Sequence, residues 1–305
     1  MNARADFNSL VEQAMAAGGR QRMRPVIEKE LLHYDILFAL DQAGLLNRLV
    51  FQGGTALRLC HGAPRFSEDL DFAGGREFRR QDLDPIKTCI EHTIGRRYGL
   101  DVRVRTPDNR DQTPRAHHVQ VNRWQISVIT APQRPDLPRQ RIHIEVANLP
   151  AWTREPRALV HNYDVLPDGY ADTLVMTETL EEIMADKLIS LINTQRYIRY
   201  RDIWDLRWLA QQGVSPDGNL ITRKIADYDV ADYLDKLEDF RTKLPDIITS
   251  KAFTDSMTRF LPAEVLERTF QRSGFSEFLQ RETDDLLKTT AALVSDNPSA
   301  PEFRI

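Results

Sequence analysis

Residues 51–72 read FQGGTALRLCHGAPRFSEDLDF, and this stretch decides the expected fold. It predicts a short strand, a Gly-Gly turn that opens a helix, and a second strand carrying Asp69 and Asp71. Side chains alternate along a strand, so these two carboxylates project from one face, with Cα atoms roughly 6.5–7 Å apart. Two carboxylates this close repel each other, and a divalent cation is the usual reason to keep such a pair.

The glycine pair Gly53-Gly54 predicts a phosphate-binding turn. A glycine pair at a helix start exposes backbone N–H groups, which favour an anion such as a nucleotide phosphate. Alone, the pair indicates only a tight turn, but the downstream acid pair favours phosphate binding. Thr55 and Arg58 are candidates for further contacts with a triphosphate. A nucleotidyltransferase needs at least a phosphate-binding turn and a metal-binding acid pair close to it.

Composition predicts a two-lobed globular protein without a membrane span. The chain has 305 residues, of which 41% are hydrophobic and 28% charged, which favours two lobes over one. We expect a cytoplasmic protein, because no apolar run reaches membrane-span length and the N-terminus lacks a signal-peptide pattern. Cys60 and Cys89 lack metal-ligand spacing, so we expect reduced thiols.

The charge distribution is uneven. The formal net charge is −4, yet residues 96–141 hold ten arginines and four aspartates, a local excess of six positive charges. Two interpretations stay open at this point. The segment is either a solvated surface with scattered ion pairs or a positive face for a triphosphate and an RNA backbone.

Periodicity predicts an α/β N-terminal part and a helical C-terminal part. The expected helices of the first part cover residues 25–43, 56–61 and 84–98. The expected strands cover residues 49–51, 70–73, 102–105, 119–129 and 141–146. After residue 172 the pattern is helical throughout, with Pro245 and Pro262 as breaks.

The sequence motifs at residues 53–58 and 67–72 resemble those of polymerase-β-type nucleotidyltransferases. More narrowly, Gly-Gly-Thr-Ala-Leu-Arg followed by Ser-x-Asp-Leu-Asp-Phe is similar to the AbiEii/AbiGii-type toxins, including the MenT branch, from bacterial toxin–antitoxin and phage-defence (abortive infection) loci. The resemblance covers roughly residues 25–215. It implies an α/β (α+β) fold, with a polymerase-β-type lobe on a mixed sheet (1–172) and a helical lobe (173–305) that completes the active-site cleft.

The same resemblance implies the chemistry and the partners. Asp69 and Asp71 would bind Mg²⁺, with Mn²⁺ as an alternative, and an NTP would be the substrate. The implied acceptor is RNA, namely the 3′ end of tRNA, whose modification would block translation and growth. The resemblance also implies an antitoxin encoded beside this protein.

Two later motifs extend the resemblance into the helical part. Residues 181–188 resemble the family's third motif, whose lysine, here Lys187, contacts nucleotide phosphates. Residues 201–206 resemble the fourth motif, which carries Asp202 and Asp205. One unbroken helix would separate Lys187 from Asp202 by about 22 Å, so we predict two helices with a turn near residues 193–195 or 199–200. The alternative interpretation is an exposed lysine and a capping aspartate pair.

Three further residues are candidates with open alternatives. Glu145 lies on a predicted strand and matches, by order along the chain, the third carboxylate that acts as general base or metal ligand. His143 shares its face and is an alternative, and a plain solvent-facing glutamate is another. Ser67 either caps the turn or, as in some relatives, is a regulatory phosphorylation point whose added charge would repel a triphosphate.

Two other function classes stay open on sequence grounds. One is a protein nucleotidyltransferase that places AMP or UMP on a Ser, Thr or Tyr hydroxyl, using the same kind of cleft. The other is a non-catalytic NTP-binding or regulatory module that keeps the fold.

Overall fold

The structure is a computed structural model that describes residues 5–16, 19–107, 119–134, 136, 138–167, 169–194 and 196–296. Two of the arginines counted above, Arg110 and Arg115, therefore lie outside the described residues. The chain divides into two compact units, residues 1–177 and 178–305. The first unit thus extends past residue 172 to include one further strand.

Among the described residues of the first unit, seven strands form one mixed sheet in the order β3-β4-β5-β2-β1-β7-β6. Two neighbouring pairs, β2 with β5 and β1 with β7, are parallel, and the other pairs are antiparallel. The strands are β1 (Val50–Gln52), β2 (Leu70–Ala73), β3 (Val102–Arg105), β4 (Val121–Val128), β5 (Gln140–Ala147), β6 (Glu155–Ala158) and β7 (Leu174–Thr177).

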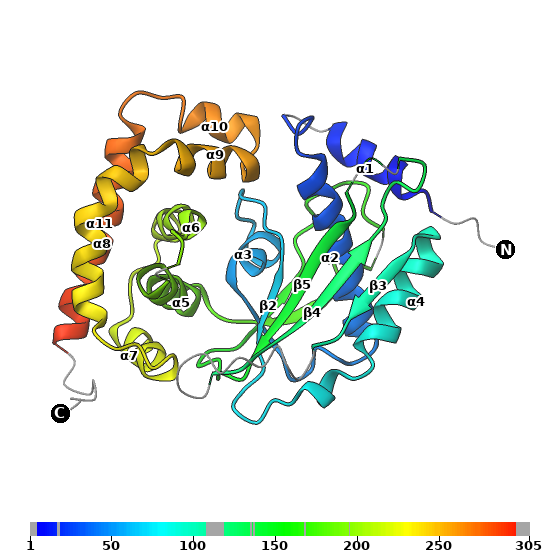
Figure 1. Cartoon of the computed structure of the whole chain (residues 1–305), viewed down its shortest axis with the longest axis horizontal. Coiled ribbons are helices and arrows are strands. Elements are labelled where there is room, and N and C mark those ends of the chain that lie inside the picture. Colours follow the sequence, from blue (N-terminus) through cyan, green and yellow to red (C-terminus); the bar gives the residue numbers. More distant parts are fainter. Residues whose placement is uncertain are drawn as a thin grey trace. The chain divides into compact units, whose positions relative to one another are not determined.

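Helices cover one side of the β3–β4–β5 part of the sheet. The first unit contains α1 (Phe7–Ala16), α2 (Arg24–Gln42), α3 (Gly53–His61), η1 (Arg80–Leu83) and α4 (Ile86–Tyr98). Helix α2 packs on β5 and α4, and α4 packs on β3 (Figure 1). The inward positions of β3, β4 and β5 are all buried, and they hold aliphatic side chains, Trp124 and the two amides Asn122 and Gln140. Alternation with a period of two thus buries one face and leaves the other to polar residues.

The described part of the second unit is helical (Figure 1). Helix α5 packs against α6, α7 and α8, and α11 runs along α8. No helix within the described ranges is long and apolar enough to cross a membrane. The helices are α5 (Leu180–Asn193), α6 (Tyr200–Gln211), α7 (Gly218–Asp227), α8 (Tyr233–Thr249), α9 (Lys251–Phe260), α10 (Ala263–Arg268) and α11 (Phe275–Ser295).

The structure corrects three expectations about secondary structure. The pattern after residue 172 does not turn directly to helix, because β7 pairs with β1 and β6 before α5 begins. Pro245 does not end a helix but lies inside α8, whereas Pro262 separates α9 from α10 as predicted. Helix α1 and the polar strand β6 were also missed.

Candidate functional site

The register of the sheet brings a third carboxylate beside the acid pair. Strand β2 pairs in parallel with β5, and Asp71 is the direct neighbour of Glu145. Cross-strand neighbours project from the same face of a sheet, so Glu145 shares the face of Asp69 and Asp71. The adjacent strand then adds Arg123, whose Nη2 lies 2.6 Å from a Glu145 carboxylate oxygen. Asp71 and Glu145 therefore lie on one face, and Asp69, just before β2, accepts a hydrogen bond from His143 on β5 beside them.

His143 holds the Asp69 carboxylate in place. The backbone N–H of His143 donates to Asp69 Oδ1 at 2.9 Å, and Nδ1 of the same histidine lies 3.0 Å from that oxygen. Burial raises the pKa of the Asp69 carboxyl, but the hydrogen bonds and charge of His143 outweigh burial, so the pKa lies below its usual range. Asp69 is therefore an oriented, ionised carboxylate. Hard oxygen donors of this kind are the ligands that Mg²⁺ prefers.

The glycine pair lies against the acid pair, as the spacing predicts. Gly53 has a φ of +75°, and a Cβ there would lie 3.1 Å from Asp71 Oδ2. A Cβ on Gly54 would lie 2.4 Å from Arg65 Nη2 and 3.1 Å from Ser67 Oγ. At Gly53 the positive φ and the close approach to Asp71 together favour glycine, and the start of α3 therefore lies against the acid pair.

Gly53→Ala should therefore lower the rate of nucleotidyl transfer by more than its loss of folding stability explains. The left-handed conformation costs an L residue about 1–2 kcal/mol, and the new methyl group would also displace the Asp71 carboxylate. Gly62→Ala is the matched control, since Gly62 has a φ of +74° with no atom within 4 Å of its added Cβ. Urea unfolding should show similar losses for both variants, while initial transfer rates should fall only for Gly53→Ala. Equal rates in the two variants would contradict the close approach.

Arg65 is a site residue that sequence reasoning missed. It is 3% exposed, and its Nη1 donates to the Phe66 carbonyl at 2.7 Å. Its Nη2 occupies the space that a Gly54 side chain would fill, beside Ser67. No spacing rule in the sequence marks this contact, because it depends on how the turn after α3 folds back. The regulatory phosphorylation of Ser67 stays a prediction.

The loop that leads to the acid pair is tied down from two helices. The Thr55 hydroxyl on α3 donates to the Asp69 carbonyl. From α2, Lys29 pairs with Glu68 at 2.8 Å, and His33 Nε2 lies 3.0 Å from the Glu68 carbonyl oxygen. Burial lowers the pKa of His33 to about 4, so its ring is neutral at pH 7 and Nε2–H donates to that carbonyl. The side chain of Thr55 therefore positions the loop that leads to the acid pair.

Arg58 is engaged inside the first unit. Its guanidinium makes a buried two-point contact with Glu30, with Nε–Oε2 and Nη2–Oε1 distances of 2.9 and 3.0 Å. It also donates to the Ala63 carbonyl and stacks over the Phe66 ring. A phosphate contact would compete with these partners. The contact of Arg58, or of Thr55, with a triphosphate stays a prediction.

In the second unit, the two predicted helices are confirmed, and they bring the later motifs together. Helix α5 ends at Asn193 and α6 begins at Tyr200. Lys187 Nζ lies 3.0 Å from Asp202 Oδ1 and 2.6 Å from Asp205 Oδ2. All three residues are buried. The expectation of an exposed lysine is excluded, because this ammonium is held between two carboxylates.

The Asp202 carboxylate is further stabilised by its neighbours. Arg199 Nε and Ser190 Oγ donate to Oδ2, the latter at 3.2 Å. Burial raises the pKa of Asp202, but the cations of Lys187 and Arg199 outweigh it and hold the pKa well below its usual range. This cluster joins α5 to α6. The assignment of Lys187, Asp202 and Asp205 to nucleotide binding and catalysis stays a prediction.

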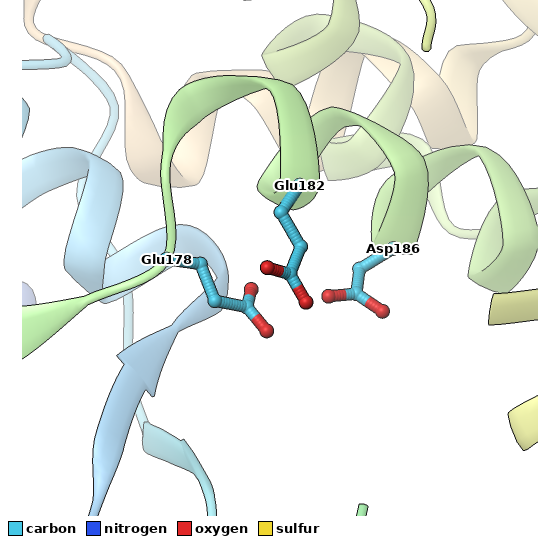
Figure 2. A group of neighbouring side chains, drawn as sticks. All are labelled: Glu178, Glu182 and Asp186. Atoms are coloured by element: carbon cyan, nitrogen blue, oxygen red, sulfur yellow. The ribbon is translucent and has the colours of Figure 1, made fainter. Parts of the chain in front are cut away.

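A second buried cluster in the same unit escaped sequence reasoning. Figure 2 shows the carboxylates of Glu178, Glu182 and Asp186 directed toward one another, with oxygens within 4.8 Å. Lys224 Nζ from α7 lies 3.1, 2.7 and 2.8 Å from these three groups in turn. The ammonium therefore takes the place that a metal ion would occupy. The four-residue spacing of Glu182 and Asp186 puts them on one face of α5, and Glu178 lies just before that helix, but nothing in the sequence points to Lys224.

The match to a family model agrees with the motifs. The model of a family described as "Nucleotidyl transferase AbiEii toxin, Type IV TA system" matches residues 35–281. A crystal structure from H. pylori, described as a candidate nucleotidyltransferase, is 17% identical and aligns over 88% of this chain and 95% of its own, with a TM-score of 0.45. JHP933 from Helicobacter pylori is 18% identical over 88% and 93%, with a TM-score of 0.44. The comparison with curated proteins gives no match.

Proposed function

The chain belongs to the AbiEii family of nucleotidyltransferase toxins, and on this premise we propose that it transfers a nucleoside monophosphate from an NTP to the 3′ end of an RNA, with tRNA as the acceptor. Family membership carries the enzyme class and the toxin–antitoxin system, with an antitoxin as partner. The RNA acceptor is our proposal. A tRNA whose 3′ hydroxyl is blocked cannot be charged, so translation and growth would stop.

One observation carries the proposed chemistry. Asp71 and Glu145 are cross-strand neighbours, Asp69 lies on the same face, and the backbone of Gly53 lies against Asp71. This arrangement supports a phosphate-binding turn beside a carboxylate set. Asp69 and Asp71 would hold Mg²⁺, which when bound neutralises charge on the transferred phosphoryl group.

The residues of this chain have distinct parts in the proposed reaction. The acceptor 3′ oxygen attacks the α-phosphorus, a new P–O bond forms, and the bond to the β-phosphate oxygen breaks to release pyrophosphate. Glu145 accepts the proton of the attacking hydroxyl. The N–H groups at the start of α3 hold the phosphates of the NTP. His143 keeps the Asp69 carboxylate oriented.

The experiment is a transfer assay with purified protein, Mg²⁺, each α-³²P-labelled NTP in turn and total tRNA. We expect label on the RNA, and none with the Asp69→Ala/Asp71→Ala variant. Label on protein in place of RNA would instead establish modification of a Ser, Thr or Tyr hydroxyl. Absence of label on both acceptors would contradict the proposal.

A further inference from the structure

The polar face of β3, β4 and β5 forms a surface that leads directly to the acid pair. It carries four exposed arginines, Arg103, Arg105, Arg123 and Arg141, which we call the arginine face. We propose that the arginine face binds the phosphate backbone of the RNA acceptor next to its reacting 3′ end. This inference rests on the proposed function and adds the place where the acceptor lies.

The register of the sheet sets the geometry of this surface. Cross-strand neighbours form three rows: Arg103, Ser127 and Arg141; Arg105, Gln125 and His143; and Arg123, Glu145 and Asp71. Members of a row project from one face. Strands lie about 4.8 Å apart, so β3 is about 14 Å from β2, three strand spacings away. A single strand whose 3′ end lies at Asp71 could therefore continue along the face past Arg123 toward β3.

The opposite side of the same strands explains why these arginines are outside. The alternate positions, Val102, Val104, Trp124, Ile126 and Ile142 among them, are buried under the helices. Alternation then leaves every arginine of the strands on the open side. The side chains of Arg103 and Arg123 are 69% and 51% exposed.

Charge changes sign across the face. The arginines lie on β3, on β4 and, in the case of Arg141, near the start of β5, whereas Asp69, Asp71 and Glu145 lie at β2 and near the end of β5. Asp101 lies 3.4 Å from Arg103, and Glu145 lies 2.6 Å from Arg123. The positive side suits phosphates, which proteins bind with arginine and lysine. The negative side is where a metal-bound triphosphate would lie.

The composition of the face favours RNA over a protein partner. In the three rows every side chain is Arg, Ser, Gln, His, Glu or Asp, and no row holds an aliphatic residue, Phe, Tyr or Trp. The core of a protein–protein interface is rich in apolar and aromatic residues and poor in charge. A flat polar face with regularly spaced guanidinium groups instead matches a phosphate backbone.

The test uses Arg103→Gln/Arg105→Gln, which leaves Arg123 and the catalytic candidates intact. Binding of tRNA labelled at its 5′ end with fluorescein is measured by anisotropy at several salt concentrations. We expect Kd to rise roughly tenfold at low salt, and the slope of log K against log salt to fall by about 1.4, because each lost single-strand phosphate contact removes about 0.7. In the transfer assay KM for RNA should rise, while kcat and KM for the NTP stay unchanged.

The matched control is Arg22→Gln/Arg48→Gln, which removes the same charge from exposed residues outside the strands. This variant should bind RNA as the wild type does. Unchanged Kd and salt slope for Arg103→Gln/Arg105→Gln would overturn the inference. If the wild type binds RNA through this face but transfers no labelled nucleotide to it, the proposed function is wrong and the inference that the arginine face binds RNA is still supported.

Discussion

Asp71→Asn should lower the rate of nucleotidyl transfer by at least about a thousandfold, because metal-assisted charge neutralisation contributes several kcal/mol and each 1.36 kcal/mol is tenfold in rate. The amide keeps the shape of the side chain, so Gly53 keeps its neighbour. It removes one of the two carboxylates assigned to Mg²⁺. Initial rates at saturating NTP and a series of Mg²⁺ concentrations measure the effect.

Folding should not account for this loss. Asp69 and Asp71 repel each other on one face of β2, so neutralising one of them relieves repulsion. The urea midpoint of Asp71→Asn should therefore equal or exceed that of the wild type. A rate within tenfold of the wild type would contradict the assignment of the acid pair to the metal.

Glu68→Gln is the matched control for Asp71→Asn. Glu68 lies in the loop just before β2 and loses the same charge, but its carboxylate pairs with Lys29 on α2. We expect its transfer rate to fall less than tenfold. A loss as large as that of Asp71→Asn would mean that the loop is sensitive to any change of charge.

The parts of the fold that the sequence predicted are those set by local pattern. Strand β2 has the predicted bounds, because Leu70 and Phe72 alternate with carboxylates within four residues. Strands β6 and β7 have no such signal. Residues 155–158 read Glu-Pro-Arg-Ala and are mostly exposed, and β7 is a strand because of its pairing with β1 and β6. Strand pairing between segments that are distant in the chain cannot be predicted from the few residues of each strand alone.

The candidate site divides in the same way. Asp69 and Asp71 follow from spacing along a strand, Glu145 was a candidate by its order along the chain, and the register brings Glu145 beside Asp71. Arg65 and Lys224 depend on turns and on helix packing, which local periodicity does not encode. Sequence reasoning therefore identified the acid pair and Lys187, which belong to motifs, and missed Arg65 and Lys224, which do not.

Lys224→Met should destabilise the second unit by about 3–5 kcal/mol, the usual cost of removing one partner from a buried ion pair. Lys224 is 2% exposed, and its ammonium contacts Glu178, Glu182 and Asp186. Methionine fills a similar volume without the charge, which leaves three carboxylates facing one another. Urea unfolding followed by circular dichroism measures the loss.

The loss should grow with pH. Burial and then the charge of Asp186 raise the pKa of Glu178 well above its usual value, against the opposing effect of Lys224. A raised pKa means that the folded state binds more protons than the unfolded state, so this contribution to stability falls as pH rises through the folded pKa. Without Lys224 the pKa rises further, so the variant should lose more stability at pH 8 than at pH 5.

Two further variants test whether the loss of stability in Lys224→Met has an electrostatic cause. Lys243→Met removes an exposed lysine paired with Asp239 on α8 and should change the unfolding midpoint little at either pH. Lys224→Met/Glu182→Gln removes one of the facing carboxylates and should recover part of the loss. Equal losses at pH 5 and pH 8, without recovery in the double variant, would mean that Lys224 acts through packing. Recovery that is larger at pH 8 instead requires that the lysine is the counter-ion of the three carboxylates.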